Sequence, residues 1–84
     1  MRVKVNGELV RATYKARGLT QAEAAMVLGV TAPTLAGWES GIVKHANDIV
    51  AIVTALGISL DKLISEPLEV QTMQMLEARI KSGM

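Results

Sequence analysis

The sequence predicts an all-α domain of five short helices, followed by a sixth, amphipathic helix near the C-terminal end. Two observations support this fold class. First, four glycines each follow a run of helix-forming residues, where a residue in the left-handed conformation commonly ends a helix; they are Gly18, Gly29, Gly41 and Gly57. Second, apolar residues near the C-terminal end recur at the three- and four-residue spacing of a helix.

Size and composition indicate one domain with a thin core. The chain has 84 residues and 50% of them are apolar, but Phe is absent and Tyr14 and Trp38 are the only aromatic residues. We expect a core of aliphatic side chains with Trp38 buried among them. The absence of cysteine excludes disulfides and thiolate metal sites, and it suits a cytoplasmic protein. We expect neither a secretion signal nor a membrane span, which needs ~20 apolar residues.

The first helix is predicted over residues 7–17, with Asn6 as its N-cap. Residues 1–5 precede it as a short N-terminal arm. Val3 and Val5 alternate with charged residues there, a pattern that fits either an extended arm or an edge strand.

The second and third helices have the clearest start signals. Thr20 and Glu23 have the spacing of a capping box, which predicts a helix from Thr20 to residue 28. Thr31 has the position of the next N-cap and predicts a helix over 31–40. Because only two residues join these helices, they form a helix-turn-helix.

Three further helices are predicted over residues 46–56, 58–64 and 67–81, with Ser59 as the N-cap of the middle one. The helix over 46–56 is apolar on almost every side, so we expect it to be covered on two sides. The last helix carries an apolar line of its own, made of Val70, Met73, Leu76 and Ile80.

This apolar line has two interpretations. In the first, residues 65–84 form a dimerisation element that joins two copies of the chain. In the second, the last helix folds back over helix 46–56 and over Met26 and Val27 of its own chain. We expect the dimer.

Charge is unevenly distributed although the net charge is only +1. Residues 1–17 hold Glu8 as their one acidic residue against a group of basic residues, whereas residues 18–43 hold no basic residue; the basic group is Arg2, Lys4, Arg11, Lys15 and Arg17. This segment suits contact with phosphates, or it is simply a solvated helix face.

Three stretches of the chain resemble the Cro/lambda-repressor-like (XRE-type) helix-turn-helix family. Residues 18–31 (GLTQAEAAMVLGVT) resemble the family's core, residues 38–41 (WESG) its end of the third helix, and residues 55–64 (ALGISLDKLI) its closing segment. The similarity covers residues 6–64, which we expect to form the lambda-repressor-like domain.

The resemblance implies a transcriptional regulator that binds double-stranded DNA as a homodimer, without a cofactor, with helix 31–40 in the major groove. In the family, the position of Gln21 places a side chain and a helix N-terminus against a DNA phosphate. Carried over by position, the expected DNA contacts are Arg17, Thr20, Gln21, Thr31, Ala32, Pro33, Thr34, Gly37 and Lys44.

Two departures from the family matter. Only Thr31 and Thr34 offer polar side chains toward the groove, where the family usually has several. We therefore expect few direct hydrogen bonds to bases. DNA shape, the basic arm or a partner protein would then supply specificity. The family often pairs an Arg of the first helix with the Glu of the third, but Tyr14 has that position here. Either the Tyr14 hydroxyl binds Glu39, or Glu39 reaches water.

Other classes of function have little support. We interpret the single histidine, His45, as a cap or surface residue. The sequence shows no metal-ligand set, phosphate-binding loop or nucleophile–base pair, so we do not expect an enzyme. The alternative to a DNA-binding regulator is a protein-interaction module on the same fold, such as an antitoxin with a toxin as its partner. The scarcity of polar side chains on helix 31–40 favours this alternative.

Overall fold

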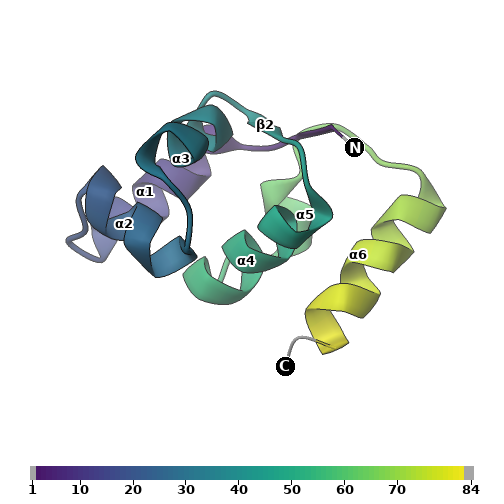
Figure 1. Cartoon of the computed structure of the whole chain (residues 1–84). Coiled ribbons are helices and arrows are strands. Elements are labelled where there is room, and N and C mark those ends of the chain that lie inside the picture. Colours follow the sequence, from purple (N-terminus) through teal and green to yellow (C-terminus); the bar gives the residue numbers. More distant parts are fainter. Residues whose placement is uncertain (1, 83–84) are drawn as a thin grey trace.

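The computed structural model describes residues 2–82, which form six helices and a small sheet of two strands (Figure 1). Residues 1, 83 and 84, part of the expected N-terminal arm and C-terminal segment, lie outside the described residues. The elements are β1 (Val3–Lys4), α1 (Gly7–Ala16), α2 (Gln21–Leu28), α3 (Ala32–Glu39), β2 (Ile42–Val43), α4 (Ala46–Leu56), α5 (Leu60–Leu63) and α6 (Val70–Ser82). This confirms the all-α class, with the sheet as a minor addition.

Three of the four predicted N-caps make the expected side-chain hydrogen bond. The Asn6 side chain accepts a hydrogen bond from the Leu9 amide at 3.1 Å and starts α1. Thr20 and Thr31 cap α2 and α3 through their side chains. Ser59 has the N-cap position of α5, but its side chain makes no capping hydrogen bond. The four glycines expected to end helices all have positive φ.

The N-terminal segment is an edge strand and part of the domain. Val3 pairs with Val43 in an antiparallel ladder, and Val5 forms a bridge to Ile64. Val3 and Val5 are both buried. The two-residue strand β2 was not predicted, because so short a segment shows no alternation of its own.

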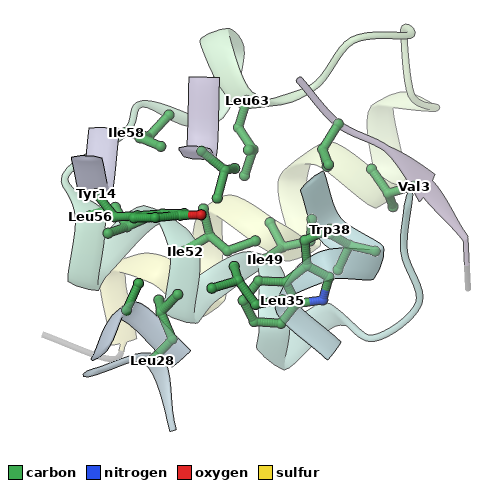
Figure 2. Close-up of a cluster of buried hydrophobic side chains, with 14 of the residues drawn as sticks. Val3, Tyr14, Leu28, Leu35, Trp38, Ile49, Ile52, Leu56, Ile58 and Leu63 are labelled. Carbon is green, nitrogen blue, oxygen red and sulfur yellow. The ribbon is translucent and has the colours of Figure 1, made fainter. Parts of the chain in front are cut away.

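The core fills the space enclosed by the helices (Figure 2). Trp38 is 2% exposed, as predicted, and it packs with aliphatic side chains from α3 and α4. Its fully buried neighbours include Leu35, Ile49 and Ile52. Within residues 2–82, no helix is both long enough and apolar enough to cross a bilayer.

Helix α6 begins at Val70, three residues later than predicted. Pro67 does not open the helix. The segment before Val70 is not helical, and within it Leu68 is partly buried against the core. Val70 is 70% exposed, so its expected place in the apolar line was wrong.

The remaining apolar line of α6 packs against α4 of the same chain. Leu76 is fully buried, and Met73 and Ile80 are partly buried beside it. Arg79 also donates a hydrogen bond to the Asn47 side chain at 3.1 Å. The chain therefore shows the fold-back arrangement over α4. Helix α6 does not cover α2, where Met26 is 79% exposed and Val27 is 56% exposed.

Candidate nucleic-acid interface

A two-residue turn sets the angle between α2 and α3. Gly29 has φ of 73°, a left-handed conformation that a residue with a Cβ rarely adopts, and its N–H bonds back to the end of α2. Thr20 and Glu23 form the predicted capping box: the Thr20 amide donates to the Glu23 carboxylate at 2.9 Å, and the Glu23 amide donates to the Thr20 hydroxyl at 3.2 Å. Hydrogen bonding from the Thr20 amide, and then from its hydroxyl, lowers the pKa of Glu23.

Helix α3 has one buried and one exposed face. Leu35 and Trp38 face the core. On the other side lie the residues expected to meet DNA; Thr31, Pro33, Thr34 and Gly37 are exposed and Ala32 is half-buried. An outward helix of this kind is free to approach a groove of DNA.

The two threonines on this face are hydrogen-bonded to each other. The Thr34 amide donates to the Thr31 hydroxyl at 3.3 Å, and the two hydroxyl oxygens lie 3.0 Å apart. Each hydroxyl has one hydrogen and two lone pairs, so one further donor remains for a base edge or a phosphate. The polar content of the face is as low as the sequence predicts.

Gly37 opens a hollow on the same face. A Cβ added at Gly37 would meet no other atom within 4 Å, so no packing inside the chain requires glycine there. The hollow, of about 360 Å³, lies between Pro33 and Thr34 on one side and Lys44 and His45 on the other. Lys44 is exposed at its rim.

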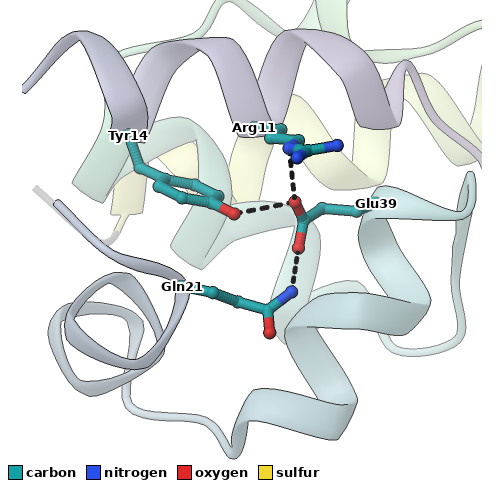
Figure 3. Close-up of polar contacts among 4 residues, drawn as sticks. All are labelled: Arg11, Tyr14, Gln21 and Glu39. Carbon is teal, nitrogen blue, oxygen red and sulfur yellow. Dashed lines mark hydrogen bonds and ion pairs between the residues drawn. The ribbon is translucent and has the colours of Figure 1, made fainter.

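Glu39, at the end of α3, accepts hydrogen bonds from α1 and α2 (Figure 3). The Tyr14 hydroxyl donates to its Oε1 at 2.7 Å, which decides between the two alternatives for Glu39 in favour of the Tyr14 contact. Gln21 Nε2 donates to Oε2 at 2.7 Å. The Glu39 side chain is only 13% exposed. Each carboxylate oxygen therefore has a donor, as a nearly buried charge requires.

Gln21 keeps part of its donor capacity. Its amide nitrogen carries two hydrogens, of which one is used by Glu39. Gln21 is exposed at the first turn of α2, where backbone N–H groups have no partner within the helix. The position expected to bind a phosphate is thus held in place and still able to donate.

Arg17 has a role inside the chain. Its guanidinium donates to the carbonyl oxygens of Ala55 at 2.8 Å and of Leu56 at 2.9 Å. These carbonyls end α4, where a positive charge is favourable. Arg17 was predicted as a DNA contact, which stays a prediction; in the structure its guanidinium links the end of α1 to the end of α4.

Arg11 was not predicted at this site. Its Nε lies 3.9 Å from the Glu39 carboxylate, and its side chain is 60% exposed. Arg11 precedes Tyr14 by three residues and Lys15 by four, so all three share one side of α1. That spacing was the signal that could have identified Arg11.

The α2–α3 unit, with its capped helices and outward third helix, defines a helix-turn-helix protein. A family model described as Helix-turn-helix matches residues 10–63, and the chain belongs to this family, the XRE-type, Cro-like group of DNA-binding regulators. Comparisons with curated proteins and with solved structures gave no significant match.

Tyr14→Phe tests the Glu39 contacts. Burial of the Tyr14 side chain, and to a smaller extent its hydrogen bond to Glu39, raises the pKa of Tyr14 above its usual value. Removing the hydroxyl should lower the free energy of unfolding at pH 7 by about 1.5–3 kcal/mol, since the acceptor is charged. A raised folded-state pKa gives stability that is lost as pH rises through that pKa, so the difference between wild type and variant should shrink above pH 10. Urea unfolding at pH 7 and at alkaline pH measures both effects.

The control is Tyr14→Phe in a Glu39→Gln background, where the acceptor is neutral and the substitution should cost less. Equal costs in the two backgrounds would mean that the Tyr14 hydroxyl does not act through the Glu39 charge.

Proposed function

We propose that the protein is a transcriptional regulator of the Cro/repressor type that inserts α3 into the major groove of DNA. The observation that carries this proposal is the exposed face of α3, with the first turn of α2 on one side and Lys44 on the other. A major groove admits one helix, and phosphates line both of its edges. We place the regulator in the cytoplasm and assign it no enzymatic activity.

Contacts to the DNA backbone would supply most of the affinity. Gln21 and Lys44 would bind phosphates on either side of the groove, with Thr20 beside Gln21 at the start of α2. Base readout would rest on two kinds of contact. Thr31 and Thr34 would hydrogen-bond base edges, and Ala32 and Pro33 would make apolar contact with thymine methyl groups. The space at Gly37 would let the DNA approach α3 closely. Sequence preference would then depend strongly on DNA shape.

We also propose that the regulator acts as a homodimer, which would place two α3 helices about 34 Å apart on one face of the DNA. Leu76 is buried against α4, so the surface of α6 left for a second copy is its outer face, with Val70 and Met75 exposed. Light scattering at micromolar concentration should give the mass of two chains for wild type and of one chain for Met75→Asp. A wild-type mass of one chain would contradict the dimer.

One observation favours the second candidate function, an antitoxin-like interaction module. Met26 and Val27 are exposed side by side on α2, and a protein partner such as a toxin would cover them. This function is compatible with DNA binding. It becomes the better account if the wild-type chain shows no salt-dependent binding to any duplex.

Two substitutions separate phosphate contact from base readout. Gln21→Ala should weaken binding to all duplexes alike, by about 1 kcal/mol, because a phosphate contact carries no sequence information. Since Gln21 also donates to Glu39, urea unfolding of the same variant measures how much the loss of that hydrogen bond costs. Thr34→Ala should instead change preference at one or two base pairs. Fluorescence anisotropy on several unrelated duplexes measures the first effect, and selection from a randomised site measures the second.

Ala36→Ser is the matched control, since Ala36 is exposed on α3 but outside the proposed reading set. Its selected site should equal that of wild type. If Gln21→Ala binds every duplex as tightly as wild type, Gln21 is not a phosphate contact.

A further inference from the structure

The helix-turn-helix unit carries no positive charge of its own. Residues 18–43 include Glu23 and Glu39 and no Lys or Arg. Attraction of the DNA backbone is mainly electrostatic, so the cations that bind it must lie outside this stretch. Lys44 meets that need on one side of α3. The other side needs its own source of positive charge.

A hollow beside α1 supplies it. The hollow, of about 610 Å³, opens between α1, the first turn of α2 and the end of α3. Arg11 and Lys15 of α1 line it together with Gln21 and Ser40, and the Tyr14 hydroxyl and the Glu39 carboxylate also contribute to its wall. Figure 3 shows Arg11 and Gln21 on opposite sides of the Glu39 carboxylate.

The two cations of the hollow are available to an outside anion. Both oxygens of Glu39 already accept short hydrogen bonds, from Tyr14 and Gln21. Arg11 pairs with Glu39 only at 3.9 Å and keeps most of its side chain in solvent. Lys15 is exposed and has no ion-pair partner among residues 2–82. One partly shielded carboxylate thus faces two cations, which leaves the hollow net positive.

We propose that Arg11 and Lys15 bind the phosphate backbone of DNA and form, with Gln21, the anchor on the α1 side of the recognition helix. This inference rests on the proposed function. The anchor uses the two cations that neighbour Tyr14 on α1, rather than a cation at the Tyr14 position itself. With Lys44 on the far side of α3, it gives the helix a cationic contact at each edge of the groove.

The test is the salt dependence of DNA binding. Each phosphate neutralised contributes about 0.9 to the slope of log K against log salt concentration. The double variant Arg11→Gln/Lys15→Gln should therefore lower the slope by about 2 and weaken binding to unrelated duplexes alike. Fluorescence anisotropy at a series of salt concentrations from about 50 to about 200 mM measures the slope for the 84-residue chain.

Two matched variants control for charge and for folding. Lys62→Gln/Lys81→Gln removes the same charge from exposed positions on α5 and α6, and its slope should stay within about 0.5 of wild type. Arg11→Lys/Lys15→Arg keeps both charges and should keep the slope. Circular dichroism melting of each variant confirms that the comparison is between folded proteins.

The outcomes separate this inference from the proposed function. Salt-dependent binding by wild type with an unchanged slope in Arg11→Gln/Lys15→Gln would overturn the α1 anchor and leave the DNA-binding function standing. An equal loss of slope in Lys62→Gln/Lys81→Gln would also overturn it, because general charge would then explain the effect. If wild type binds no duplex, the proposed function itself fails.

Discussion

The position of α3 depends on how its last residue, Glu39, is held. A carboxylate at the C-terminal end of a helix is unfavourable, because the backbone carbonyls there already carry negative partial charge. Tyr14 from α1 and Gln21 from α2 each donate a short hydrogen bond to it. The backbone of Glu39 also lies so close to Gly7 that a Cβ at Gly7 would collide with it. Three helices therefore meet at Glu39, and this junction, together with the burial of Leu35 and Trp38, sets the direction in which α3 faces solvent.

This junction also connects structure with the proposed function. The Gln21 side chain that donates to Glu39 is the one proposed to bind a phosphate, so this proposed contact would be oriented before DNA binds. Arg11 lies on the other side of the carboxylate, near enough to be attracted but free to bind elsewhere. Affinity would come from these flanking groups and from Lys44, whereas the exposed face of α3 offers only two hydroxyls. Under the proposed function, such a regulator would bind the DNA backbone strongly and would read few bases directly.

Local signals made most of the fold predictable. Asn6, Thr20 and Thr31 specify helix starts through their own side chains, and a left-handed glycine ends α2, so neighbouring residues alone contain the information. The pairing of Tyr14 with Glu39 was one of two alternatives that the sequence left open, because a carboxylate at risk of burial needs either a donor or water. The features that sequence left open or missed depend on distant contacts. Strand β2 exists because Val3 pairs with Val43, and the face that α6 buries is decided by its packing on α4. The three residues before Val70 are not helical, and Leu68 among them packs against the core. Arg17 could not be assigned to the end of α4 without the tertiary structure.

The central claim is that DNA binds on the exposed face of α3 and its flanks. The most direct test is an NMR titration of the labelled protein with a short duplex, following backbone amides throughout residues 2–82. The account predicts that the largest shift changes fall on Gln21, on residues 31–37 and on Lys44, with smaller changes along the Arg11 side of α1. Changes centred on Met26 and Val27 or on α6, with α3 unaffected, would contradict it.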